Sequence, residues 1–265
     1  MCIRDRNITS HVPKYLDGNI RKLIASSNED MLVCLTSGVK SECYIYKWYN
    51  AAQERLQSSW SKWTFDKDIL DVSFNNAELY FTFADGSYEK MDLALDKSVL
   101  LDHHTYVEDD LPQDYPTDGL VAVTLNGESL GAYTGDMSDV IVGVPYPFKY
   151  QVSEQVFKPA QGDVTKLARF QLRKMAFNYS NTGHFNVEVK SVGRDAVTST
   201  FTGRILGQSA NELGKSAVVD DGSFQVGIQS QANQTDITIT NDTHLPCVFQ
   251  SAEWEGFVTL RNQRL

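Results

Sequence analysis

The sequence predicts an all-β protein, because two features recur along most of its length. Apolar and polar residues alternate with a period of two, as they do in strands that bury one face. Short groups of Gly, Asn, Asp and Ser separate these stretches, and such residues favour tight turns. No stretch shows a convincing helical period. We predict a partial β-propeller of about two blades, followed by a C-terminal β-sandwich or barrel.

The first blade is expected in the N-terminal quarter of the chain. Four strands are predicted there, at residues 20–26, 31–35, 42–49 and around Trp60, Trp63 and Phe65. Four short antiparallel strands in succession, ending in a tryptophan-rich one, are typical of a propeller blade. The aromatic residues of this region favour packing between blades over a carbohydrate site, since aromatic side chains supply much of the buried area of β cores and interfaces. They are Tyr44, Tyr46, Trp48, Tyr49, Trp60 and Trp63.

The second blade is predicted to contain three strands, at residues 69–74, 79–83 and 88–93. Leu70, Val72 and Phe74 are expected to share one face of the first of these strands. Propellers often close their ring with a strand from a distant chain terminus. We therefore hypothesise that the fourth strand of this blade comes from elsewhere in a longer polypeptide.

The sequence suggests four segments. Residues 1–6 look like translated sequencing adapter and are expected to be a non-native leader, and residues 7–97 form the blades. Residues 98–119 are rich in acidic residues, Pro and Gly, which is typical of a linker. Residues 120–265 are predicted to form the C-terminal β domain. Its strands are expected at residues 120–125, 140–144, 148–157, 169–190, 197–204, 223–229, 236–240 and 248–260.

Residues 169–190 predict a hairpin with a turn at residues 180–183. The apolar alternation slips by one residue near Arg173-Lys174. A β-bulge at this point would keep the same face of the strand directed inward.

The charge balance argues against a nucleic-acid-binding surface. The formal net charge is -10 with an isoelectric point of about 4.9, whereas nucleic-acid binders usually carry a basic stripe. Lys14, Arg21 and Lys22 are too sparse for that role. Arg169, Arg173 and Lys174 could instead contact an acidic neighbouring subunit. The N-terminus has no apolar run long enough to predict a signal peptide or a membrane span.

No catalytic, cofactor-binding or metal residue is predicted. The densest group of possible metal ligands, Asp102-His103-His104 with Glu108, Asp109 and Asp110, places adjacent histidines on opposite faces of an extended segment, so a solvated role is favoured. Glu253 and Glu255 could suggest a glycosidase pair, but such acids usually face each other across a cleft. Trp254 is therefore expected to be buried between two solvent-facing acids. Cys34 and Cys43 could pair across a hairpin, but free buried thiols are favoured because synthesis in a reducing cytosol is expected.

Several segments resemble the tail tubular protein B, or nozzle, family of short-tailed bacteriophages. They are residues 8–15, 57–63, 177–183 and 250–256, together with Leu245 to Phe249 and Arg261 to Leu265. The resemblance covers most of residues 7–265. It implies that the chain is a C-terminal fragment, because members of the family extend further on the N-terminal side.

The resemblance also implies the function and the partners. Members of the family form a homohexameric ring in the virion tail, below the tail adaptor (tail tubular protein A), where they help to dock the tail fibres and channel double-stranded DNA during ejection. The protein would be made in the host bacterial cytoplasm and would need no cofactor. Two alternatives remain open, a tail-associated polysaccharide hydrolase and a carbohydrate-binding β-propeller protein. An exposed Trp48 or Trp60 would favour the latter.

Overall fold

The computed structural model describes residues 15–51, 54–93, 99–108, 111, 115, 118–155, 168–204 and 217–260. The protein is all-β over these residues, where five antiparallel sheets form and none of them closes on itself. The chain divides into two compact units, residues 1–96 and 97–265. The expected leader at residues 1–6 lies outside the described residues.

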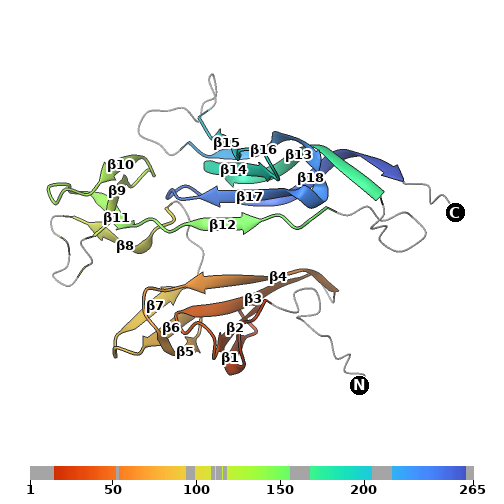
Figure 1. Cartoon of the computed structure of the whole chain (residues 1–265). Coiled ribbons are helices and arrows are strands. Elements are labelled where there is room, and N and C mark those ends of the chain that lie inside the picture. The colour runs from red at the N-terminus through yellow and green to blue at the C-terminus, as the bar shows by residue number, and fades with distance from the viewer. Residues whose placement is uncertain are drawn as a thin grey trace. The chain divides into compact units, whose positions relative to one another are not determined.

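Unit 1 begins with a four-stranded meander in which each strand pairs with the next one in sequence (Figure 1). Its strands are β1 (Ile20–Ser26), β2 (Met31–Thr36), β3 (Glu42–Ala51) and β4 (Glu54–Thr64). The positions of these four strands agree with the sequence prediction. Short connections and antiparallel pairing follow from the turn residues between the apolar runs.

A three-stranded meander follows, with the order β5-β6-β7. Its strands are β5 (Ile69–Asn75), β6 (Glu78–Phe83) and β7 (Tyr88–Asp92). Asn76 adopts a positive φ of 54° and Gly86 one of 86° in the two turns, a conformation that these residue types tolerate better than most. Among the described residues no fourth strand pairs with this sheet, and the origin of a fourth strand stays a prediction.

The face predicted for β5 is partly wrong. Ile69 is buried at 1% exposure, whereas Leu70 is 58% exposed. The register shifts between Ile69 and Asp71, so one extra residue lies in β5 and turns Leu70 outward. Arg21 on β1 donates hydrogen bonds to the carbonyl oxygens of Leu70 at 2.9 Å and Ile69 at 2.7 Å. The bulge therefore also connects the two meanders.

The two meanders share one hydrophobic core. Its buried residues are Met31, Val33, Leu35, Cys43, Ile45, Ile69, Val72, Leu79, Phe81 and Phe83. Phe65 packs against Phe81 with ring centroids 4.6 Å apart. One face of the β1–β4 sheet is thus covered by β5–β7.

Unit 2 contains a sheet with the order β10-β9-β11-β8. Its strands are β8 (Asp102–Val107), β9 (Val121–Thr124), β10 (Ser129–Ala132) and β11 (Val140–Val144). β8 lies inside the segment 98–119 that the sequence suggests as a linker, and Val107, which pairs with Val140, is fully buried. A single apolar anchor in a polar strand gives little alternation to detect. The division of the chain into domains stays a prediction.

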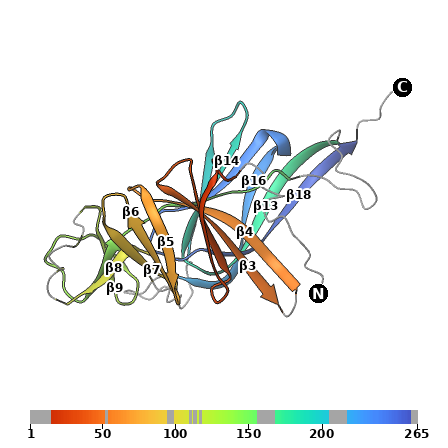
Figure 2. The same ribbon diagram turned by 90° about the horizontal axis from the view of Figure 1, so that it is seen from below.

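The remaining strands of unit 2 form two sheets (Figures 1 and 2). One has the order β12-β17-β14-β15, with β12 (Phe148–Gln151), β17 (Thr235–Asn241), β14 (His184–Ser191) and β15 (Val197–Thr202). The other has the order β16-β13-β18, with β16 (Val219–Gln231), β13 (Ala168–Thr182) and β18 (Val248–Leu260). The 3₁₀ helix η1 (Ala232–Gln234) joins β16 to β17.

The predicted hairpin at residues 169–190 is wrong, because β13 and β14 lie in different sheets. They contact through side chains instead: the rings of Tyr179 and Phe185 are 6.1 Å apart, and both residues belong to one core shared by the two sheets. Alternation shows that each strand buries one face, but it does not distinguish edge pairing from face-to-face packing.

The predicted bulge in β13 is confirmed. The register shifts between Leu172 and Lys174 against both neighbouring strands, β16 and β18. The extra residue keeps one face inward along the whole strand. That face consists of Phe170, Leu172, Met175, Phe177 and Tyr179, all at most 8% exposed.

Candidate functional surfaces

The histidine-containing segment of β8 forms no preformed metal site in the described part of the chain. Asp102, His103 and His104 are all exposed. His103 has a positive φ of 51°, next to a register shift in the pairing of β8 with β11. No group of three or more His, Cys, Asp or Glu residues converges among the residues that the structure describes. Asp109 and Asp110 lie outside those residues.

The expected burial of Trp254 is wrong, since its side chain is 43% exposed. Trp254 pairs with buried Met175 across the β13–β18 ladder and packs against the ring of Phe170 at a centroid distance of 4.9 Å. β18 is the last strand of its sheet in the described residues, so an inward-facing residue on it can still lie at the open margin of the core.

The two acids beside Trp254 are bound by polar neighbours on β13. Glu255 forms ion pairs with Arg173 at 3.0 Å and with Lys174 at 3.2 Å. Glu253 accepts a hydrogen bond from Asn178 at 3.3 Å. The hydrogen bond from Lys174, with the nearby charges, lowers the pKa of Glu255. A general acid for glycoside cleavage needs the opposite shift.

The basic residues predicted to meet a neighbouring subunit lie close to this pair. Arg173 and Lys174 contact Glu255 within the chain. Arg169, four residues earlier on the same strand, is exposed. Arg21 and Lys22 contact β5 instead. Arg21 donates a hydrogen bond to the carbonyl oxygen of Ile69 at the β5 bulge, and Lys22 forms an ion pair with Asp71. Lys14 lies outside the described residues.

The aromatic residues of the first meander lie on both of its faces. Trp63 packs on the core shared with β5–β7. On the opposite face, Tyr46 lies 5.1 Å from Trp60 and 5.7 Å from Trp48, and both tryptophans are half-buried. Tyr44 and Tyr46 are each only 2% exposed. We call this second face the aromatic face of unit 1.

Cys34 and Cys43 are free buried thiols, as predicted. In the β2–β3 ladder Cys34 pairs with Tyr44 and Leu35 with Cys43. This offset of one residue directs the two thiols to opposite faces of the sheet, so they cannot bridge. Burial raises the pKa of Cys43 to about 12.

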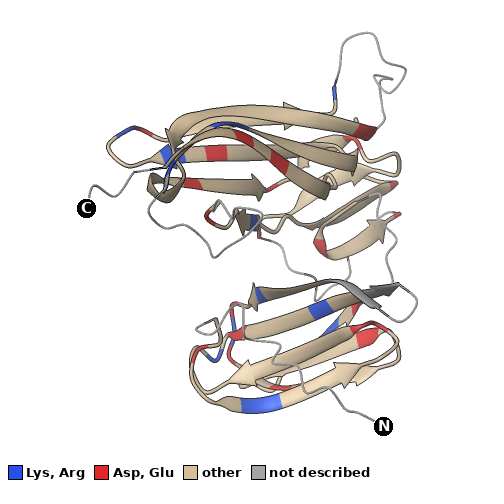
Figure 3. Ribbon diagram, turned by 90° about the vertical axis from the view of Figure 1, so that its right-hand side faces the viewer, with Lys and Arg blue, Asp and Glu red and all other residues tan. Residues whose placement is uncertain are grey.

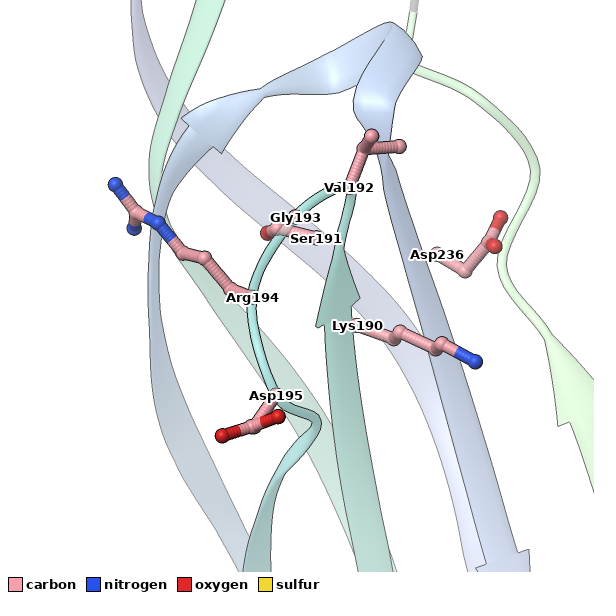
Figure 4. Close-up of a pocket in the computed structure, with 7 residues that line it drawn as sticks. All are labelled: Lys190, Ser191, Val192, Gly193, Arg194, Asp195 and Asp236. Carbon is pink, nitrogen blue, oxygen red and sulfur yellow. The ribbon is translucent and has the colours of Figure 1, made fainter.

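A shallow pocket of about 280 Å³ lies at the turn between β14 and β15 (Figure 4). It is lined by Lys190, Ser191, Val192, Gly193, Arg194, Asp195 and Asp236. Figure 4 shows the charged side chains pointing in different directions rather than toward a common point. The arrangement is that of a turn.

The middle of the outward surface of the β16-β13-β18 sheet carries mainly uncharged polar side chains, and the charged residues Arg169, Arg173, Glu253 and Glu255 lie along β13 and β18. Strand register places Asn178 beside Ser223 and Ser251, and Ala176 beside Gln225 and Glu253. Asn178 donates a hydrogen bond to Ser251 at 2.9 Å. Figure 3 shows basic residues scattered over the described ribbons, without a continuous basic strip in that view. Such a surface offers few partners to phosphate groups.

These features describe an antiparallel β protein, and comparison with known proteins gives its class. A family model described as bacteriophage nozzle protein matches residues 4–125 and 95–265, so the chain belongs to this family. It is 24% identical over 301 aligned residues to tail tubular protein gp12 of Escherichia phage T7. The alignment covers 94% of this chain but 38% of that relative.

The structure contains no membrane-crossing helix in its described part. The only helix there is η1, of three residues, and nothing among these residues is both long and apolar enough to span a bilayer as a helix.

Proposed function

We propose that this chain is a structural component of a short phage tail, in which it forms part of the wall of the nozzle. Membership of the nozzle family carries this proposal. In the proposed assembly the complete protein forms a homohexameric ring below the tail adaptor, supports tail-fibre docking, and lets double-stranded DNA pass during ejection. Its place is the virion tail, after synthesis in the host cytoplasm.

The surface chemistry supports a passive conduit. Each phosphate that a protein neutralises releases counterions and strengthens binding, so a wall that lets DNA slide should avoid free cations. The chain has a formal net charge of -10. Of the cations on β13, Arg173 and Lys174 both contact Glu255, and Arg169 is exposed.

The finer fold belongs to the same proposal. We interpret β1–β4 and β5–β7 as two propeller blades, and the two sheets built from β12 to β18 as a β-sandwich. The strand order of each meander and the core shared by the two sheets of unit 2 support this interpretation.

The alternative functions receive less support from the described residues. The lowered pKa of Glu255 and its ion pairs are unsuitable for a hydrolase acid. Trp48 and Trp60 are half-buried against Tyr46 rather than presented as an open platform. Hydrolysis or binding of a glycan by the purified protein would restore these alternatives.

The experiment that tests the proposed function is the assembly state of a full-length version of the protein. Native mass spectrometry and negative-stain imaging, with and without the tail adaptor protein, should show a six-fold ring that binds the adaptor. A full-length protein that stays monomeric in both conditions would contradict the proposal.

A further inference from the structure

Within the described part of the chain, the strand β18 has an open edge. It is 13 residues long and pairs only with β13 among the described residues. Its sequence contains no Lys and no Pro, the residues that commonly protect a sheet edge from pairing with another chain. The segment 250–256, which carries part of the family resemblance, lies on this strand.

Large aromatic side chains are exposed on both faces of β18. Trp254, on the face toward the core, is 43% exposed, and Phe257, which pairs with Gln171 on the outward face, is 62% exposed. Gly256 lies between them, and a Cβ at this position would approach the carbonyl oxygen of Gln171 to 2.5 Å. The two aromatic residues therefore flank a point where β18 packs too closely on β13 to carry a side chain.

The charge beside this edge differs from that of the whole chain. The chain has 34 acidic and 24 basic residues, but β13 presents Arg169, Arg173 and Lys174 next to β18. Arg173 and Lys174 share one carboxylate, Glu255, so the local charge is more positive than that of the remaining surface. A second, net acidic copy of the same chain is complementary to such a cluster.

We propose that the β18 edge, with Trp254, Phe257 and the neighbouring Arg169, is the surface through which one copy of this chain contacts the next. The inference rests on the proposed ring and assigns its subunit contact. The aromatic residues supply the buried anchors of the interface, since aromatics and Arg are enriched in interface centres and Lys and Glu are depleted there. The open strand edge supplies backbone hydrogen bonds. A contact made by two different surfaces of each copy forms a ring when the rotation between successive copies closes.

Site-specific photo-crosslinking of this chain tests the assignment. The photoreactive residue p-benzoylphenylalanine replaces Phe257 in one variant. In the matched control it replaces Tyr88, which is 74% exposed on β7. We expect a covalent dimer from the variant at position 257 and none from the control. Absence of a crosslink at 257, or equal crosslinking at both positions, would overturn the proposal.

Sedimentation equilibrium provides an independent readout. Phe257→Lys should weaken self-association by about tenfold, as expected for the loss of an interface anchor, while Tyr88→Lys should not. Phe257→Thr keeps a residue that favours strands and should give the same loss with an unchanged melting midpoint. Association that is unaffected in both Phe257 variants would refute the assignment.

The same substitutions in the full-length protein separate this inference from the proposed function. Rings that persist with Phe257→Lys would overturn the interface but leave the nozzle function standing. A wild-type full-length protein that forms no ring would instead contradict the function.

Discussion

Replacing Phe185 by Ala tests whether the two sheets of unit 2 are held together by one aromatic core. Phe185 is fully buried, and its ring lies 4.9 Å from those of Phe201 and Phe249 and 5.4 Å from that of Phe224. Removing a buried Phe side chain costs about 3–5 kcal/mol, because the lost transfer free energy adds to the cost of the cavity. Because the partners of Phe185 come from both sheets, we expect a loss near the upper end of this range.

Differential scanning calorimetry and urea unfolding measure this loss. For a unit of this size, about 4–5 kcal/mol corresponds to a decrease of roughly 8–20 °C in the melting midpoint. Trp254→Ala is the matched control, because its partly exposed ring should cost less than half as much, roughly 2 kcal/mol. Equal losses for the two variants, or a loss below about 1 kcal/mol for Phe185→Ala, would refute the shared core.

Three further predictions concern contacts outside this core. Glu255→Gln should lower the melting midpoint slightly at neutral pH but not in acid. The pKa of Glu255 in the folded protein lies below the ordinary value of 4.5, so ionised Glu255 stabilises the fold above that pH, and this stabilisation is lost as the pH falls. A difference between variant and wild type that persists in acid, or is insensitive to salt, would contradict the ion pair. Arg21→Ala should destabilise unit 1 by about 1 kcal/mol and speed amide exchange at the start of β5, because two carbonyl oxygens of the bulge lose their hydrogen-bond donor. Arg194→Ala, which removes an exposed arginine, is the control. If Arg21→Ala leaves the exchange rate as unchanged as the control does, the hydrogen bonds from Arg21 to β5 do not stabilise the bulge. In a Cys2→Ser background, the half-buried Cys247 should react with a thiol reagent before Cys34 and Cys43. Burial protects Cys34 and Cys43 from the reagent, and it raises the pKa of Cys43 to about 12. Rapid labelling of Cys43 in the folded protein would contradict the structure of β3.

Strand positions could be predicted from the sequence because alternation is a local property. The four strands of the first meander and the bulge near Arg173 are of this kind, since each depends on which side chains must face inward. Two strands lacked this signal. β10 has an exposed pattern throughout, and β8 has a single fully buried residue, Val107. Strands held mainly by backbone pairing leave little trace in the hydrophobic pattern.

The pairing of strands and the exposure of edge residues could not be predicted, because both depend on distant parts of the chain. β13 and β14 are joined directly at Gly183, yet they belong to different sheets. Trp254 has the inward parity of a buried residue, but β18 has no neighbour on its outer side among the described residues. The spacing of Glu253 and Glu255 argues against a glycosidase pair from the sequence alone, whereas their contacts with Lys174 and Asn178 required the register of the β13–β18 ladder.

The β1–β4 sheet of unit 1 buries side chains on both of its faces. A sheet with one solvated face shows buried residues on alternate positions only, whereas a sheet covered on both faces reads as a continuous apolar run. In β2, five of six residues are buried and Leu32 is half-buried. The core with β5–β7 accounts for Val33 and Leu35 but not for Cys34, which faces Tyr44 on the aromatic face. Tyr15 packs on that face, 5.6 Å from Tyr44 and 6.5 Å from Trp60, so the chain itself supplies part of the cover. Burial on both faces is compatible with the proposed blade, because a blade inside a propeller has neighbours on both faces.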